Sequence, residues 1–578
     1  MKIIFTSFFL LAASSSLLLA QDIFVNQAGY LAGRQKLVYF DQPADSFYII
    51  DKTSGKIQFS GSINTSKIND PATGMNVYYG DFSMFKKEGI YEIKDDSNKV
   101  SYPFEISSDP FKDVYKKSLK GFYFQRCGIK LLPEYAGKYA RPACHLNDGV
   151  FEPSTGLTGY RSVTGGWHDA GDFGKYVVNA GITIGTLLLG YEIFPDNFSS
   201  DDLNIPESGN SIPDILDEVK YELEWLLKMQ DSDGGVFFKV TPKHFSGFIM
   251  PESDSSARYI YQKSTAASGD FAAMMAMAAR IYPPFDSLFA IECLKASKKS
   301  WHYLESNPSI IPEGGFHNPP GTSTGQYGDR NDSDERLWAA AELFITTGDS
   351  TFGNYFSGHY QNFNLLNSTM GWPNVAPIAE LDYLFSSRNR TDTAIKSELG
   401  KGLINYCSKL DSISKNDGFN VSLNLFEYNW GSNGVVMNNA VMLIMGYQLT
   451  GNKDFLNSAL EQFNYILGCN GNNISYITGI GSKSVMHPHH RTSAADGIAE
   501  PVPGLLAGGP NRYLTDKILK SKFSPSTPPG LCYSDTQESY ASNEIAINWN
   551  APLVFVAGFF SGDKYINELN RRVIFNTK

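Results

Sequence analysis

The sequence is poor in the features that mark several common classes of protein. Basic residues are fewer than acidic ones, 49 against 60, so the formal net charge is −11. A nucleic-acid-binding protein needs a basic surface to hold phosphates, so this balance argues against nucleic acid as a partner. No low-complexity linker divides the chain. We therefore expect its domains to pack on each other rather than swing freely.

Long apolar runs are confined to the N-terminus. Lys2 is followed by an apolar stretch that ends at Ala20, the pattern of a secretory signal peptide over residues 1–20. A membrane anchor is the alternative, but the polar run 14–16 interrupts the stretch. No other segment approaches the ~20 apolar residues needed to span a bilayer. The sequence predicts a secreted or periplasmic protein.

Cysteine is also scarce. The six are Cys127, Cys144, Cys293, Cys407, Cys469 and Cys532. An even number in a secreted chain permits disulfides, but a long chain with 42% hydrophobic residues has ample core without them. Only Cys127 and Cys144 have a suggestive spacing.

Residues 22–107 have the pattern of a small β-sandwich. Short runs rich in aromatic and β-branched residues alternate with clusters of Gly, Asp, Asn and Ser, which predicts a sandwich of the immunoglobulin type. In the last run, 102–106, Phe104 and Ile106 alternate with Glu105, as expected of a half-buried strand. The runs are 37–40, 47–50, 57–59, 77–79 and 102–106.

The apolar period then becomes helical, over residues 108–578. Ser211 is predicted to cap a helix with a regular apolar stripe. Residues 271–279 are apolar on nearly all sides and predict a buried helix. Residues 338–344 and 438–447 each run into a Gly turn followed by another helix. Recurring helical hairpins predict a closed helical barrel.

Two carboxylate clusters lie far apart in the sequence. The first holds Asp169 and Asp172 among glycines and aromatic residues, and the second holds Asp535 and Glu544 beside several rings. Hydrolysis of the acetal between two sugars needs two carboxyl groups, one to donate a proton and one to handle water or the anomeric carbon. The alternatives are that Asp172 caps a following helix and that Glu544 is a surface charge.

A third cluster is rich in histidine. His487, His489, His490 and Arg491 lie within one short segment, although the whole chain has only 9 His. We interpret these side chains as donors and acceptors for sugar hydroxyls beside the reacting bond. Metal binding and a solvated loop are the alternatives.

These three segments resemble the three signature regions of glycoside hydrolase family 9, the inverting cellulases and related β-glucanases. The first resembles that family's Asp-Ala-Gly-Asp block. The second, over residues 475–491, matches its Ser-x-aromatic-Thr to Pro-His-x-Arg block, and the third, over residues 533–551, matches its aromatic-x-Asp to Asn-Ala block. The resemblance covers about residues 110–565. Residues 22–107 resemble the immunoglobulin-like module that precedes one branch of the family.

The resemblance implies an (α/α)6 barrel of twelve helices with an open substrate cleft at one end. It also implies that Asp172 is the general base, that Asp169 helps to hold the attacking water, and that Glu544 is the general acid. The predicted sugar-binding residues are His489, Arg491, Tyr540 and Trp430. Asp535 belongs to the signature and is expected to have a structural role.

A fourth group predicts a metal site. Cys127, Cys144, His145 and His168 offer two thiolates and two imidazoles, a set that suits tetrahedral zinc. Their spacing resembles a zinc site in the immunoglobulin-bearing branch of the family. Four protein ligands would make the zinc structural, anchoring the loop that continues into Asp169. A Cys127–Cys144 disulfide is the alternative.

Calcium is the second predicted metal. Ser493 and Asp496 resemble part of a calcium site of the family, although this chain has Gly497 where the site has a further acid. The acid turn 231–234 is another candidate, with an ordinary loop as the alternative.

The sequence therefore predicts a secreted, inverting endo-β-1,4-glucanase. An exo-acting β-glucosidase or glucosaminidase and an endo-xyloglucanase are alternatives within the enzyme class. A non-catalytic carbohydrate-binding protein is a third reading, against which the intact Asp169, Asp172 and Glu544 argue. The sequence shows no C-terminal binding module or dockerin-like repeat, which favours soluble or short glucans over crystalline cellulose. We expect a monomer that binds a β-glucan polysaccharide or oligosaccharide.

Overall fold

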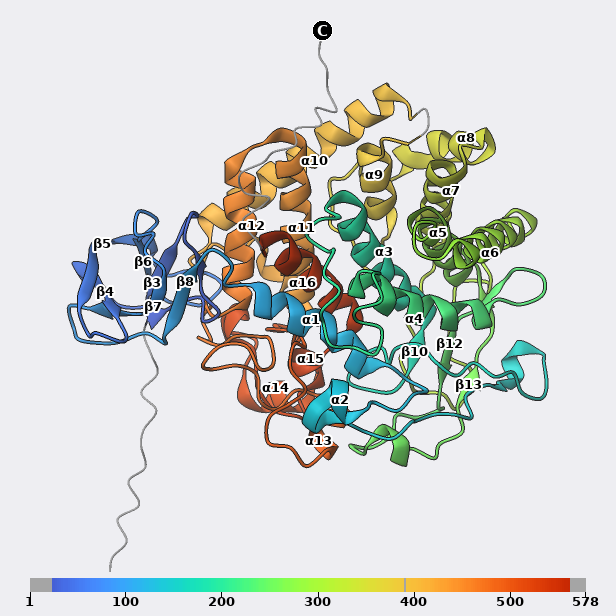
Figure 1. Ribbon diagram of the computed structural model, residues 1–578, viewed down its shortest axis with the longest axis horizontal. Coiled ribbons are helices and arrows are strands. Elements are labelled where there is room, and N and C mark those ends of the chain that lie inside the picture. The colour runs from blue at the N-terminus through green and yellow to red at the C-terminus, as the bar shows by residue number, and fades with distance from the viewer. Residues whose placement is uncertain (1–22, 389–390, 562–578) are drawn as a thin grey trace, which may run out of the picture.

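A computed structural model describes residues 23–388 and 391–561 of the chain. Figure 1 shows a small β domain beside a larger helical domain. The predicted fold class, a β-sandwich followed by an (α/α)6 barrel, is confirmed. The predicted signal peptide, residues 1–20, lies outside the described residues. No helix in the described part of the chain is long and apolar enough to cross a membrane.

The β domain consists of eight strands in the hydrogen-bonded order β1-β3-β6-β5-β4-β7-β8-β2. Phe104 and Ile106 are buried and Glu105 is exposed, so the predicted alternation is confirmed. The strand begins at Phe104 rather than at residue 102, because Pro103 has no N–H to donate. The strands are β1 (Ile23–Phe24), β2 (Tyr30–Leu31), β3 (Leu37–Phe40), β4 (Ser46–Asp51), β5 (Ile57–Lys67), β6 (Val77–Asp81), β7 (Gly89–Asp95) and β8 (Phe104–Ser107).

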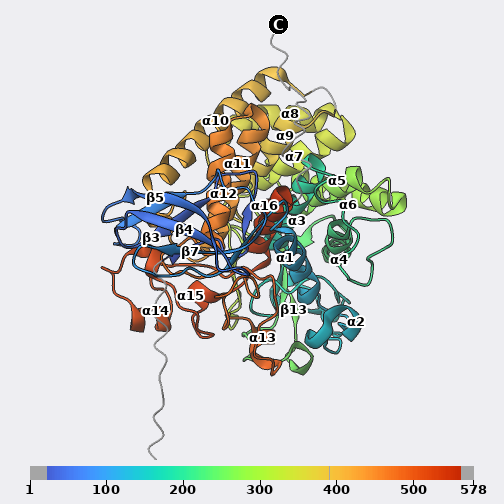
Figure 2. The ribbon, with the colours of Figure 1, turned by 60° about the vertical axis from the view of Figure 1, so that its left-hand side comes forward.

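The β domain packs on the outside of the barrel, against α12 (Lys453–Ile466) (Figure 2). The Tyr39 hydroxyl donates to the Glu461 carboxylate at 2.8 Å, and the Asn26 side-chain amide donates to Asn464 at 2.8 Å. Both contacts are buried, so the two domains are held against each other as the missing linker predicts.

Twelve of the helices in the described residues form two concentric rings. The inner helices, such as α5, are buried on nearly all sides, whereas outer ones such as α10 bury one largely apolar face. The inner ring is α3 (Val177–Ile193), α5 (Thr265–Ile281), α7 (Ser333–Thr347), α9 (Ala376–Phe385), α11 (Ser432–Thr450) and α16 (Ile547–Phe560). The outer ring is α1 (Lys112–Gln125), α4 (Asp214–Met229), α6 (Ser287–Ser306), α8 (Ser350–His359), α10 (Thr393–Asn416) and α12.

Glycine turns join inner to outer helices, as predicted. Gly348 ends α7 with φ of 73° and Gly451 ends α11 with φ of 71°, the left-handed conformation that terminates helices. The predicted Ser211 cap is wrong. Ser211 has φ of 72° and its N–H donates to Asp201 at 2.7 Å, so α4 begins only after Pro213.

Short elements gather at one end of the barrel, the lower end in Figure 1. They connect the helices, and the loops between them carry most of the polar residues singled out in the sequence. They are β9 (Val150–Phe151), β10 (Lys175–Tyr176), β11 (Val236–Phe237), β12 (Lys239–Thr241), β13 (Tyr259–Ile260), β14 (Lys263–Ser264), α2 (Pro133–Ala136), α13 (Arg491–Ala495), α14 (Lys517–Lys522) and α15 (Tyr540–Asn543).

Candidate active site

Backbone hydrogen bonds bring the three polar segments together at this end of the barrel. The Arg491 N–H donates to the Gly171 carbonyl at 2.9 Å, and His489 pairs with Glu544 in a parallel bridge. A Cβ on Gly171 would lie 1.8 Å from the carbonyl oxygen of His489, so only glycine allows this approach. The three segments are therefore held together by backbone contacts, independently of their side chains.

Asp169, Asp172 and Glu544 line one cavity of about 380 Å³. Aromatic side chains form much of the remaining wall. Such a cavity combines carboxyl groups with flat apolar surfaces that suit the C–H faces of sugar rings. The aromatic lining consists of Tyr176, Phe245, Tyr327, Trp372, Trp430 and Trp549.

Asp172 is held by the loop that follows it. Its Oδ2 accepts the N–H of Gly174 at 2.9 Å. Helix α3 begins at Val177, after the extended residue Tyr176, and no side chain caps it. Asp172 is therefore not a helix cap, and its buried carboxylate faces the cavity instead.

Two side chains fix the carboxyl group of Asp169. The Tyr327 hydroxyl donates to Oδ2 at 2.7 Å, and the Asn179 amide donates to Oδ1. Burial and the negative charge of Asp172 raise the pKa of Asp169 to about 8. Sequence reasoning missed both partners. Asn179 is a polar residue in the otherwise apolar helix α3, which is a usable signal, whereas Tyr327 lies in a loop with no motif.

Glu544 is in a different environment from a surface carboxylate. Loss of solvent and the negative charges of Asp172 and Asp169 raise its pKa well above the usual value, while the positive charge of Arg491 opposes that rise. A carboxyl group with a raised pKa can hold a proton near neutral pH and donate it.

Arg491 and His489 lie beside these carboxyl groups. The Arg491 guanidinium lies over the Phe245 ring at 5.4 Å, and its Nε donates to the Ser246 carbonyl at 2.9 Å. Its Nη1 has no hydrogen-bond partner among the described residues. His489 Nδ1 is hydrogen-bonded to the Gln537 carbonyl at 2.7 Å. Arg491 thus retains one unpaired donor, which is buried rather than exposed in the cavity.

The histidine segment is only partly solvated and is not one of the metal-binding groups found in the described residues. His490 is buried, with Nδ1 hydrogen-bonded to Ser493 at 2.8 Å and Nε2 to Gln125 at 3.2 Å. His487 is exposed and presents its backbone N–H to Asp535 at 2.8 Å. Asp535 also accepts the Met486 N–H, so it braces the loop and supports the structural role expected for it.

Trp430 and Tyr540 form an aromatic pair at the rim. Their ring centroids are 5.2 Å apart at 47°, and Trp430 is 47% exposed. Tyr540 also contacts the His489 ring edge to face, at 6.1 Å. Exposed ring faces beside a cavity can stack on sugars, whereas a core pair could not.

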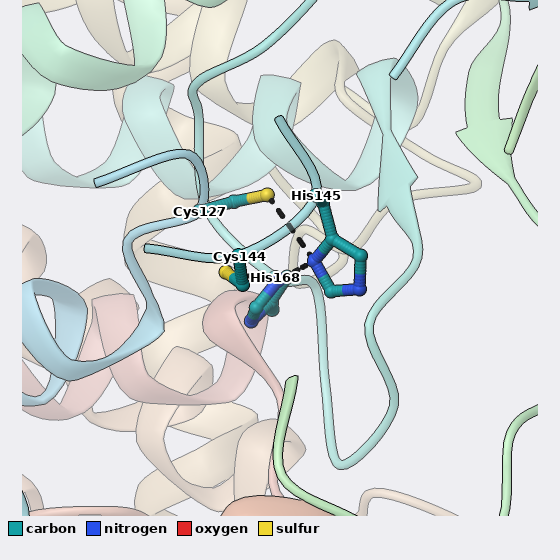
Figure 3. A group of neighbouring side chains, drawn as sticks. All are labelled: Cys127, Cys144, His145 and His168. Carbon is teal, nitrogen blue, oxygen red and sulfur yellow. Dashed lines mark hydrogen bonds between the residues drawn. The ribbon is translucent and has the colours of Figure 1, made fainter. Parts of the chain in front are cut away.

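Four potential metal ligands converge next to the cavity (Figure 3). Cys127 Sγ lies 3.6 Å from His145 Nδ1, Cys144 Sγ lies 4.0 Å from His168 Nε2, and the two imidazole nitrogens are 3.2 Å apart. Tetrahedral zinc with bonds of about 2.3 Å to sulfur and 2.0 Å to nitrogen requires ligand atoms about 3.3–3.8 Å apart. The three measured distances lie within or about 0.2 Å outside this range, so the four residues suit zinc with only small shifts of their side chains. Cys127 and Cys144 are not joined by a disulfide in the structure.

The surroundings of this group also suit a metal. Arg141 Nη1 donates to Cys144 Sγ at 3.2 Å, and an Asp254 carboxylate oxygen lies 3.6 Å from His145 Nε2. This separation is longer than a hydrogen bond, so the carboxylate faces the histidine ring without bonding to it. His168 directly precedes Asp169, so its position constrains the candidate catalytic loop.

The calcium candidates are less well formed. Ser493 already binds His490, and Asp496 Oδ1 accepts the Ile498 N–H at 2.8 Å. They do not belong to a group of three or more metal-binding side chains in the described residues, so calcium there stays a prediction. In the acid turn 231–234, Asp231 pairs with Arg161 at 2.7 Å and with a lysine, which leaves an ordinary loop.

Comparison with known proteins places these features in context. The sequence matches the family Glycosyl hydrolase family 9 over residues 111–557 and the Cellulase N-terminal ig-like domain over residues 19–100. It is 38% identical to Endoglucanase D of Acetivibrio thermocellus, over 94% of this chain and 84% of that protein. It is 35% identical to a xyloglucan-specific endo-beta-1,4-glucanase of Bacteroides ovatus, over 94% of each chain. A solved Zn-binding triple mutant of GH family 9 endoglucanase J30 has a TM-score of 0.87 and 31% identity, over 93% of this chain and all of that one.

Proposed function

Because this chain belongs to glycosyl hydrolase family 9, we propose that it hydrolyses β-1,4-glucosidic bonds within glucan chains and inverts the anomeric configuration. One observation carries the proposal. Asp172, Asp169 and Glu544 line a single cavity walled by aromatic rings, at the end of the barrel where the three signature segments meet. Endoglucanases among the relatives support the same bond type.

Glu544 is the proposed general acid. It gives its proton to the glycosidic oxygen as the bond to the anomeric carbon breaks, so the leaving sugar departs as an alcohol. The raised pKa of Glu544 supports this role, because the acid must be protonated before the bond breaks.

Asp172 is the proposed general base. Its carboxylate takes a proton from a water molecule, and that water attacks the anomeric carbon on the face opposite the leaving group. Inversion follows, so a β-bond yields an α-anomer. Asp169 helps to hold the water, and Tyr327 and Asn179 keep the Asp169 carboxyl group in place.

The substrate is proposed to lie across the aromatic walls, beside His489 and Arg491. Arg491 offers its free Nη1 to a sugar hydroxyl, and Trp430 and Tyr540 supply ring faces at the rim. A soluble or short β-glucan fits this arrangement. Xyloglucan is the second candidate substrate, favoured by the relative from Bacteroides ovatus that spans nearly the whole chain.

Zinc is proposed to bind Cys127, Cys144, His145 and His168. When bound, it would act as a structural cross-link, because four protein ligands leave no open position for substrate or water. The four side chains come from three segments of the chain, since Cys144 and His145 are adjacent, and His168 is covalently joined to Asp169. The role of these residues is therefore to set the position of the catalytic loop. We also propose that the enzyme is secreted, with residues 1–20 removed.

The product pattern tests the proposed function. Purified enzyme is incubated with carboxymethylcellulose, mixed-linkage glucan, xyloglucan and cello-oligosaccharides, and products are sized over time. An endo-acting β-1,4-glucanase lowers polymer length early and releases a range of oligosaccharides. Release of only one small sugar from chain ends would instead identify an exo-acting enzyme. Preferred cleavage of xyloglucan would favour the second candidate.

A further inference from the structure

A series of contacts runs from the cysteine–histidine group to Arg491 and to Phe245, which lines the cavity. It starts at His145, whose Nε2 points away from the other potential ligands and lies 3.6 Å from Asp254 Oδ2. The two side chains are only 1% and 2% exposed. At this distance the pair is not hydrogen-bonded, and Asp254 is the carboxylate that faces an otherwise unpartnered Nε2.

Asp254 then controls the loop that precedes it. The Ser246 hydroxyl donates to the same oxygen, Oδ2, at 2.6 Å, which closes residues 246–254 into a loop across its base. The backbone N–H of Ser256 donates to the other oxygen at 3.0 Å. Both carboxylate oxygens of Asp254 are therefore engaged in orienting this loop.

This loop contacts Arg491. The Ser246 carbonyl accepts the Arg491 Nε–H at 2.9 Å, and the guanidinium lies over the rings of Phe245 and Phe248, at 5.4 and 5.8 Å. The Phe248 ring also meets His489 edge to face at 5.2 Å. The loop thus sets where the free Nη1 of Arg491 points.

We infer that Asp254 and Ser246 are positioning residues that couple the metal-binding group to the substrate-binding guanidinium of Arg491. The same group is then linked to two lining residues of the cavity, to Asp169 through His168 and to Phe245 through His145 and the loop that contacts Arg491. The inference rests on the proposed function, because it takes Arg491 as a sugar-binding residue.

Steady-state kinetics of Asp254→Asn and Ser246→Ala test this coupling on a soluble glucan. Asn has nearly the size of Asp but no negative charge, so its interactions with His145 and Ser246 are weaker. We therefore expect KM to rise about tenfold and kcat to change by no more than about twofold. Ser253→Ala, in the exposed part of the same loop, is the matched control and should leave both constants unchanged. If kcat falls while KM stays constant, the positioning role is overturned.

A double-mutant cycle separates coupling from general damage to the loop. Arg491→Ala alone should raise KM, and Asp254→Asn should add little to it, because the two changes remove one shared contact. If the increases in KM of the two single variants multiply in the double variant, the inference is overturned, whereas the proposed hydrolytic function is not affected. An unchanged KM in Arg491→Ala would overturn both the sugar-binding role of Arg491 and this inference.

The link between Asp254 and the proposed metal site is tested by spectroscopy, without measuring catalysis. The protein is loaded with Co²⁺, whose visible absorption bands report the ligand field of the site. Asp254→Asn should retain one metal per chain and shift these bands, because His145 loses the carboxylate that faces it, whereas Ser253→Ala should not. Identical spectra in the wild type and Asp254→Asn would overturn the link between Asp254 and His145, whatever the activity of the enzyme.

Discussion

His489 and Glu544 are paired in an isolated parallel β-bridge, which sets the candidate sugar-binding histidine beside the candidate acid. Further backbone bonds, from His489 N–H to the Asn543 carbonyl and from Gly508 N–H to the Glu544 carbonyl, are each 2.8 Å long. The position of Glu544 is thus fixed by the main chain. Replacement of its side chain should change the chemistry of the site without displacing it.

Glu544→Gln should abolish cleavage of natural glucans. Gln has nearly the same shape but cannot donate a proton to the leaving oxygen. Activity on aryl glycosides with an acidic leaving group should survive to a far greater extent, because that group leaves without protonation. The two substrates are compared by kcat/KM, and equal losses on both would count against Glu544 as the acid.

The activity on natural glucan should fall as the pH rises through the pKa of Glu544. Loss of solvent and the charges of Asp172 and Asp169 raise this pKa, so the active, protonated form persists above the ordinary range of a glutamic acid. The alkaline limb of kcat/KM should disappear with an activated aryl glycoside. An identical alkaline limb on both substrates would assign that limb to another group.

The same shift predicts a stability effect with a defined sign. A carboxyl group that binds its proton more tightly in the folded than in the unfolded chain stabilises the fold at low pH. That contribution is lost as the pH rises from the unfolded pKa through the raised folded pKa. Relative to wild type, Glu544→Gln should therefore become more stable with increasing pH, as measured by denaturant unfolding. A difference that does not depend on pH would contradict the shift.

Tyr327→Phe should lower kcat on the order of tenfold, since a hydrogen bond to a carboxyl group is lost beside the reacting water. The motive is the 2.7 Å contact between the Tyr327 hydroxyl and Asp169. Tyr360→Phe, which removes a hydroxyl bound to Glu398 away from the cavity, is the control. A similar change of kcat in both variants would show that the Tyr327 hydroxyl has no specific role in catalysis.

Cys144→Ser should lower the melting temperature and the activity together. A closed metal site contributes folding energy and positions its neighbours without touching substrate. The affinity of the surviving active enzyme for glucan should change little. Elemental analysis of the wild type should find about one zinc per chain. Absence of zinc, together with a Cys127–Cys144 disulfide detected by mass spectrometry, would overturn the metal site.

The fold was predictable because its signals are local. Apolar residues at helical spacing and the glycine turns after α7 and α11 lie within short segments, and these segments form the hairpins expected of them. The Ser211 cap failed because Ser211 lies in a turn bound by Asp201 and has φ of 72°, whereas an N-cap residue is extended. Local sequence patterns do not show such turns.

The candidate site was predictable only where it is a motif. Asp169 and Asp172 share one short segment, and Glu544 lies in another, so their chemistry can be read from the chain. Tyr327 and Asp254 act through contacts with residues far away in the sequence, which form only in the folded barrel. No motif or residue spacing predicts them. These partners, and the loop that contains Ser246, were identified only from the folded structure.

The anomeric form of the first product tests the central claim most directly. Asp172→Ala should lose activity on every substrate, on the order of 10²–10⁴-fold, but such a loss has several causes. Proton NMR of a cello-oligosaccharide digested by the wild type follows the new reducing end before mutarotation. The account predicts that the α-anomer appears first, because the water activated by Asp172 attacks opposite the leaving group. An initial β-anomer would show retention and contradict the assignment of Asp172 as base.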